Sequence, residues 1–213
     1  MLPSNPTPQI FLHQDDLPEH LDLGPIVAID TETMGLKPVR DRLCLIQMSS
    51  GDGFCHLVQF KPTQRPYHAP RLKKMLENPL VTKIFHFARF DVHVLKFYLN
   101  LECKSIYCTK IASKLVRTFT DRHGLKDLCK DLLDIELSKQ QQSSDWGAET
   151  LTAEQLKYAA SDVLYLHRLK EKLDFLLKRE DRINLAQSCF NFLTSRVELD
   201  LLGLEEVDIF AHQ

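Results

Sequence analysis

The chain alternates short apolar runs with longer segments in which apolar residues recur every three or four positions. Short apolar runs bounded by turn residues predict β-strands. We expect strands over residues 26–30, 43–48, 54–58, 81–87 and 105–108. The first run follows Gly24-Pro25 and stays apolar up to its last residue, which predicts a strand buried on both faces.

Helical periodicity predicts helices over residues 70–77, 90–98, 110–116, 125–133, 152–178 and 181–201. Pro70 stands at a helix start, where its missing N–H is not needed. Thr152 and Gln155, three residues apart, predict a capping box at the start of the fifth helical segment.

The order of these elements predicts an α/β fold in a single main domain. A tight-turn sequence at residues 50–53 should join the second and third strands into an antiparallel hairpin. A hairpin followed by alternating strands and helices predicts a mixed five-stranded sheet flanked by helices. We divide the chain into an N-terminal tail and lead-in, a main domain, and a C-terminal helix on the core or at a subunit interface: 1–19, 20–178 and 179–213.

Composition excludes several classes of protein. The 213 residues are 44% hydrophobic and 26% charged, which is typical of one globular domain rather than a disordered chain. The net charge of −2 gives no general basic field for binding long duplexes. The six cysteines form no CxxC pair, which favours reduced thiols in a cytoplasmic protein. We expect neither an export signal nor a membrane span.

Acidic residues recur at three places where strands end or helices begin. Asp30 and Glu32 are two apart at the end of a strand, so both carboxylates should point to the same side. Asp91 falls in the first turn of a helix, where a negative charge is favoured in any case. Tyr158 and Asp162 are four apart on one helix face. Each place taken singly also has a structural explanation. Asp30 and Glu32 could form a polar turn, Asp91 could be an acid at a helix start, and Tyr158 could be a half-buried tyrosine beside a surface acid at Asp162.

The three places together indicate one site. Four carboxylates gathered at one point repel each other and are tolerated only with cations between them. That arrangement is typical of sites that hold two divalent metals and cut phosphodiesters. The sequence therefore predicts a metal-dependent nuclease.

At these residues the chain resembles the DEDD superfamily of 3′-5′ exonucleases, in the subgroup whose third motif carries a tyrosine. Three further segments resemble the ribonuclease D branch: 124–128 (GLKDL), 144–146 (SDW) and 156–162 (LKYAASD). The resemblance implies a ribonuclease H-like (DnaQ-like exonuclease) fold. Because few residues follow the matching part, the chain is most similar to the nano-RNase C type. That type cleaves very short oligonucleotides, dinucleotides in particular, and forms rings of eight subunits.

The resemblance also implies roles for individual residues. Asp30, Glu32, Asp91 and Asp162 would hold two Mg²⁺ or Mn²⁺ ions, with Asp30 bridging them. Tyr158 would orient the attacking water, and the products would be nucleoside 5′-monophosphates. Contacts with substrate are expected from seven residues around the motifs: Thr31, Met34, Gly35, Leu36, His86, Phe90 and Trp146.

Several alternatives stay open. Leu36 is either a wedge between two bases or a core leucine, His86 is either a substrate contact or a structural histidine, and Trp146 either stacks on a base or packs. The basic residues between Lys110 and Lys130 either attract substrate phosphates, or contact another subunit, or form a solvated face. A general exonuclease on longer RNA or single-stranded DNA would use the same motifs, and a non-catalytic nucleic-acid-binding module would keep the fold. An unrelated metal phosphatase fits the helix motif poorly.

Overall fold

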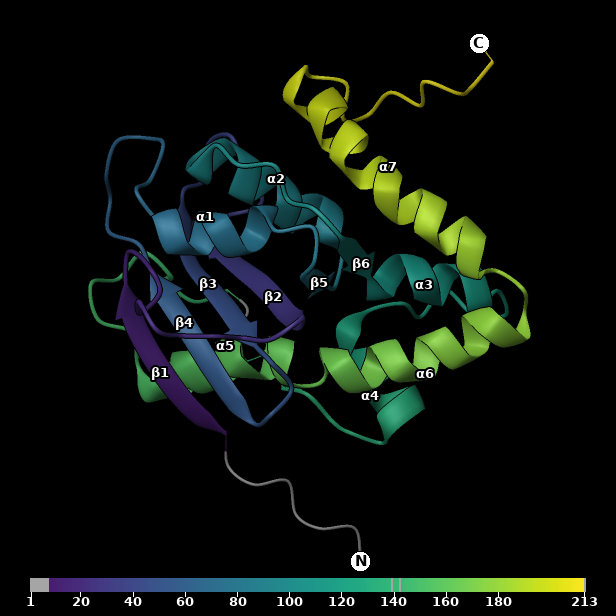
Figure 1. The fold of residues 1–213 in the computed structure, drawn as a ribbon, viewed down its shortest axis with the longest axis horizontal. Helices are drawn as coiled ribbons and strands as arrows, with labels where there is room; N and C mark the ends of the chain where they lie inside the picture. Colours follow the sequence, from purple (N-terminus) through teal and green to yellow (C-terminus); the bar gives the residue numbers. More distant parts are fainter. Residues whose placement is uncertain (1–7, 139, 142, 213) are drawn as a thin grey trace, which may run out of the picture.

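The computed structural model describes residues 8–138, 140–141 and 143–212, so the first seven residues of the expected tail lie outside it (Figure 1). Its sheet has six strands in the order β1-β4-β3-β2-β5-β6. Their bounds are β1 (Gln9–Gln14), β2 (Ile26–Thr33), β3 (Leu43–Ser49), β4 (Phe54–Gln59), β5 (Thr82–Phe85) and β6 (Ile106–Cys108). Parallel and antiparallel neighbours both occur, which confirms the predicted mixed sheet.

The strand β1 corrects the predicted count of five strands. It pairs in parallel with β4 at the edge of the sheet, where Ile10 lies opposite Cys55. Most of its side chains are exposed or half-exposed. An edge strand of this kind needs neither a continuous apolar run nor a strict alternation, and so the sequence analysis assigned it to the lead-in.

The strand β2 lies between two different partners. It is antiparallel to β3, with Asp30 opposite Gln47, and parallel to β5, with Ala28 opposite Ile84. Its middle residues, Val27 to Ile29, are completely buried. The strands β3 and β4 form the predicted antiparallel hairpin. The first half of β2 is therefore bonded on both sides, and its acidic end is held by the pairing with β3.

Seven helices surround the sheet in the described part of the chain. Their bounds are α1 (Pro70–Glu77), α2 (Ala88–Leu99), α3 (Thr109–Val116), α4 (Leu125–Leu133), α5 (Ala153–Leu164), α6 (Leu166–Arg179) and α7 (Ile183–Leu201). The helical segment predicted over 152–178 is divided at Tyr165 into α5 and α6. The predicted capping box is confirmed, because the Gln155 N–H donates to the Thr152 hydroxyl and the Thr152 N–H donates to the Gln155 side chain.

The helices α2 and α5 lie on opposite sides of the sheet (Figure 1). α5 packs on β1 to β4, whereas α2 contacts β2, β3, β5 and β6. α7 packs against α2, α3 and β6. None of these described helices combines the length and the apolar surface that crossing a bilayer requires.

The C-terminal end of α7 is tied to the start of α2 by a buried carboxylate. Both Asp200 oxygens accept hydrogen bonds from Arg89, each at 2.8 Å, and Arg196 donates to the same carboxylate at 2.7 and 3.0 Å. The two arginines also donate to main-chain carbonyls of the following segment, at Glu205 and Val207. One carboxylate thus organises two helices and the chain that leaves them.

We predict that Asp200→Ala lowers the free energy of unfolding by about 2 kcal/mol, because it removes charge-assisted hydrogen bonds from two arginines. Urea unfolding measures the change. The matched control is Glu206→Ala on the exposed segment that follows, which should have little effect. Equal stability of the two variants would mean that the Asp200 cluster does not stabilise the fold.

Candidate metal centre

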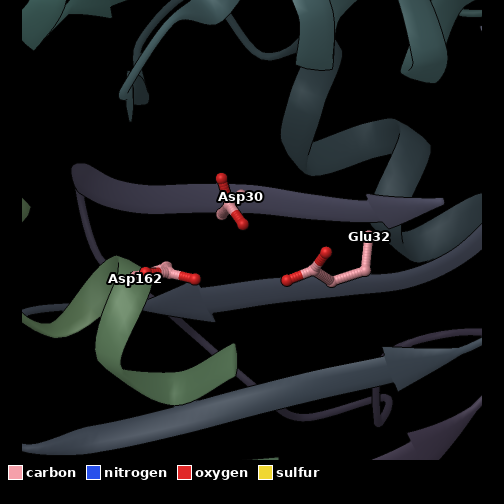
Figure 2. Close-up of side chains that lie close together, drawn as sticks. All are labelled: Asp30, Glu32 and Asp162. Carbon is pink, nitrogen blue, oxygen red and sulfur yellow. The ribbon is translucent and has the colours of Figure 1, made fainter. Parts of the chain in front are cut away.

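Three carboxylates converge where the end of β2 meets α5 (Figure 2). Asp30 and Glu32 alternate along β2, so their side chains point to the same face of the sheet. Asp162 reaches them from α5, and the three residues each offer an oxygen within 4.8 Å of the other two. Residues far apart in the sequence are thus brought to one point, as the motif pattern predicted.

Asp91 lies beside this group and approaches from α2, on the other side of the sheet. Thr31 points away from its neighbours Asp30 and Glu32, and its hydroxyl donates to Asp91 Oδ1 at 2.7 Å. The Asp91 side chain is only 2% exposed. Thr31 therefore fixes the orientation of Asp91 and leaves its second carboxylate oxygen without a bond to Thr31.

Burial raises the pKa of all four acids, and neighbouring carboxylates raise it further for three of them. Burial raises the pKa of Asp30 to about 7. Burial, together with the charges of Asp30, Asp162 and Asp91, raises the pKa of Glu32 to about 10. Burial and the Asp30 charge raise the pKa values of Asp91 and Asp162 well above the ordinary range. The protein alone cannot carry all four negative charges at neutral pH.

Gln47 is a polar residue of this site that the sequence analysis missed. It lies on β3 directly opposite Asp30 and is completely buried. Its Nε2 is 3.3 Å from Asp30 Oδ2 and 3.4 Å from Glu32 Oε1, so it donates toward both carboxylates. A glutamine inside the apolar run 43–48 was the available signal, since buried polar side chains need a partner.

The donor set fits a hard divalent cation. The converging ligands are carboxylate oxygens, with no sulfur or imidazole nitrogen among them. Oxygen ligands of this kind suit Mg²⁺ and Mn²⁺ rather than zinc. A cation would also remove the electrostatic cost of ionising the carboxyls.

Tyr158 stands one helical turn before Asp162 and is half-buried. Burial and the nearby Asp162 carboxylate raise the pKa of its phenol, which keeps it protonated at neutral pH. The ring of Trp146 lies 6.1 Å from the Tyr158 ring, between centroids, and Trp146 is only 3% exposed. In this arrangement Trp146 packs behind Tyr158.

An open cleft of about 660 Å³ contains the converging acids Asp30, Glu32 and Asp162. Leu36 lines this cleft and is 86% exposed, so it is not a core leucine. Its loop is held by Asp41, which accepts a hydrogen bond from the Lys37 main chain at 2.9 Å. A Cβ at Gly35 would overlap the Asp41 carboxylate, which explains the glycine before Leu36. The other six predicted substrate contacts also line the cleft: Thr31, Met34, Gly35, His86, Phe90 and Trp146.

The cleft is also lined by Phe87 and two lysines that the sequence analysis did not single out as cleft residues. Phe87 precedes α2 with a φ of 68°, so β5 ends earlier and α2 begins earlier than predicted. Lys110 Nζ lies 4.4 Å from the centre of the Phe87 ring. Lys110 and Lys126 both line the cleft.

Three other residues of the predicted basic stretch are engaged in ion pairs away from the cleft. Arg117 and Arg122 both pair with Asp131, and Lys130 pairs with Asp134. The stretch is therefore not one continuous basic surface, and only part of it faces the cleft.

Comparison with known proteins agrees with this site. The family model described as "3'-5' exonuclease" matches residues 13–178. The chain is 30% identical to ribonuclease D of Gluconacetobacter diazotrophicus over 186 residues, which are 86% of this chain and 46% of that protein. The chain thus spans about half the length of the curated relatives it matches. It belongs to the 3′-5′ exonuclease family, as its motifs predicted.

Within that family the chain resembles NrnC. Brucella melitensis NrnC bound to pGG superposes with a TM-score of 0.92 and 53% identity, over 97% of this chain and 100% of that chain. Brucella melitensis NrnC with bound Mg²⁺ gives a TM-score of 0.91 and 52% identity, over 96% and 100%. These similarities confirm the predicted ribonuclease H-like fold and the predicted likeness to nano-RNase C.

We predict that Mn²⁺ stabilises the protein more at about pH 8.5 than at about pH 5.5. Unfolded carboxyls titrate near pH ~4, whereas in the folded protein Asp30 and Glu32 titrate near 7 and 10. The folded state thus holds protons that the unfolded state releases, so stability without metal falls as pH rises through this window.

Bound Mn²⁺ replaces those protons and should offset the loss. Melting temperatures, measured with and without MnCl₂ at matched ionic strength across this pH range, test the expectation. The same metal-induced shift at both ends of the range would contradict it.

Proposed function

We propose that this chain is a metal-dependent 3′-5′ exoribonuclease that hydrolyses short oligoribonucleotides, dinucleotides in particular, to nucleoside 5′-monophosphates. The observation that carries the proposal is the convergence of Asp30, Glu32 and Asp162 in an open cleft, with the buried Asp91 close to them. Support comes from Brucella melitensis NrnC, which resembles the chain over nearly its whole length and has been seen with Mg²⁺ and with pGG.

In this proposal Asp30, Glu32, Asp91 and Asp162 would hold two Mg²⁺ or Mn²⁺ ions. When bound, such ions supply a nucleophilic hydroxide at neutral pH and stabilise charge on the leaving 3′ oxygen. Gln47 restrains Asp30 and Glu32 through its amide, and Thr31 restrains Asp91. The protein thereby positions the ligands before the substrate arrives.

Tyr158 is the residue that we propose orients the attacking water. Its phenol is poorly suited to act as the base, because an unperturbed phenol titrates near pH ~10 and burial raises the pKa further. Packing of Trp146 behind the ring limits its rotation. Tyr158 therefore acts by hydrogen bonding from a fixed position.

The walls of the cleft supply the substrate contacts. Leu36 is free to insert between two bases, with Met34 and Gly35 beside it and Phe90 available to pack on a base. Thr31 would meet the substrate through its main chain, since its hydroxyl is bonded to Asp91. Lys110 and Lys126 would contact phosphate oxygens. Two lysines and a net charge of −2 suit a substrate with few phosphates.

We also propose that the chain works as a cytoplasmic homo-oligomer, an octamer by resemblance. Its six cysteines are free thiols, which accords with a reducing compartment. Phe175 on α6 and Phe210 beyond α7 are large exposed apolar side chains that a subunit contact would cover.

We predict that dinucleotides turn over far faster than RNA of about ten residues, because the cleft is small and has few cationic side chains. Product analysis on an RNA length series and a matched DNA series, with Mn²⁺ present, measures this. Equal rates along the RNA series would indicate a general 3′-5′ exonuclease. Binding without release of mononucleotides would indicate a non-catalytic module.

Asp91→Asn should lower turnover by more than about a hundredfold while leaving the fold intact. An asparagine still accepts the Thr31 hydroxyl hydrogen bond but cannot supply a negative ligand. Dinucleotide turnover and circular dichroism together measure the two effects, and Asp208→Asn on the exposed C-terminal segment is the control. Full activity of the Asp91→Asn variant would remove Asp91 from the metal centre.

A further inference from the structure

His86 directly follows β5, the strand that pairs with the metal-site strand β2. It lines the same cleft as Asp30 and Glu32, which lie at the end of β2. It lines the cleft together with Phe87 and Lys110. A group at this place can meet the part of a substrate that adjoins the reacting phosphate.

The hydrogen bonds of Thr109 determine which ring nitrogen of His86 carries the proton. The Thr109 hydroxyl lies 2.9 Å from His86 Nδ1 and 3.1 Å from the Phe85 carbonyl oxygen, and Thr109 is completely buried. The hydroxyl has one hydrogen, and a carbonyl oxygen can only accept. Both contacts are hydrogen bonds at the same time only if the hydroxyl donates to the carbonyl and Nδ1 donates to the hydroxyl.

With its proton on Nδ1, a neutral His86 has an unprotonated Nε2, which is an acceptor and not a donor. Burial and the Lys110 charge lower the pKa of His86 to about 3, which agrees with a neutral ring. Such a nitrogen cannot donate to a phosphate oxygen, whereas it can accept from a hydroxyl. The hydroxyls nearest to a scissile phosphate belong to the sugars.

We propose that His86 Nε2 accepts a hydrogen bond from a 2′-hydroxyl of the substrate and thereby makes the site prefer RNA to DNA. The inference rests on the proposed exonuclease function and names the sugar chemistry that its site selects. Thr109 is a positioning residue in this arrangement, because it acts on substrate only through the tautomer of His86.

The test compares pGG with versions of it that lack single hydroxyls: the 2′-hydroxyl of the first nucleotide, the 2′-hydroxyl of the second, and the terminal 3′-hydroxyl. For the wild type, loss of one 2′-hydroxyl should lower kcat/KM about tenfold, the effect of one hydrogen bond. In His86→Ala the same deletion should have no further effect, since the acceptor is gone. His86→Gln, which keeps an acceptor oxygen, should recover part of the selectivity, and His20→Ala outside the cleft should behave as wild type.

The tautomer has its own readout. In ¹⁵N-labelled protein at neutral pH, two-bond ¹H–¹⁵N spectra should show His86 with its proton on Nδ1. Thr109→Val should produce a mixture of tautomers and a smaller 2′-hydroxyl effect, with the melting temperature recorded to show that the variant is folded. A proton on Nε2 in the wild type would overturn the inference.

The kinetic outcomes separate the inference from the function on which it rests. If the wild type cleaves pGG but His86→Ala slows ribo and deoxy substrates by the same factor, the inference fails and the proposed function stands. If only the terminal 3′-hydroxyl matters, the inference also fails. If the wild type releases no mononucleotide from any of these substrates, both the proposed function and the inference that rests on it are wrong.

Discussion

Repulsion between buried carboxylates determines what the site at the end of β2 can bind. Asp30, Glu32 and Asp162 offer oxygens within 4.8 Å of one another, and Asp91 adds a fourth acid beside them. In a protein interior such charges are costly unless they are neutralised by protons or by cations. The fold maintains the cluster without a compensating arginine or lysine in contact with it among the described residues, which is what a site built for cations requires.

The sheet explains how these charges are held in place. β2 is bonded on both sides, and its alternation sends Asp30 and Glu32 to one face and Thr31 to the other. α5 then brings Asp162 to the first face, while α2 brings Asp91 to the bond with Thr31. A single strand thus collects acids from two layers of helices, and a shift of its register by one residue would disperse them.

The sequence predicted the parts of this arrangement that depend on local pattern. Residues 27–29 are apolar because this part of β2 is completely buried. The capping box at Thr152 and Gln155 marks the start of α5, the helix that carries Tyr158 and Asp162. Two acids two apart on a strand must share a face, whatever surrounds them. These features depend on neighbours in sequence, so they could be read without the fold.

The remaining features depend on tertiary context. The strand β1 is half-exposed at an edge and carries no strong pattern. Gln47 belongs to the site only because the β2–β3 register places it opposite Asp30. Whether Leu36 lies in the core or in the cleft is decided by the conformation of its loop, which Asp41 holds. Which ring nitrogen of His86 carries the proton depends on Thr109, more than twenty residues away in the sequence.

Anomalous scattering at the manganese edge, from crystals of the protein soaked in Mn²⁺, locates bound cations directly. We expect two anomalous peaks between the carboxylates, both in contact with Asp30 and each bonded to at least one of Glu32, Asp91 and Asp162. Anomalous density that is absent from this cluster, in crystals where the four side chains are ordered, would contradict it.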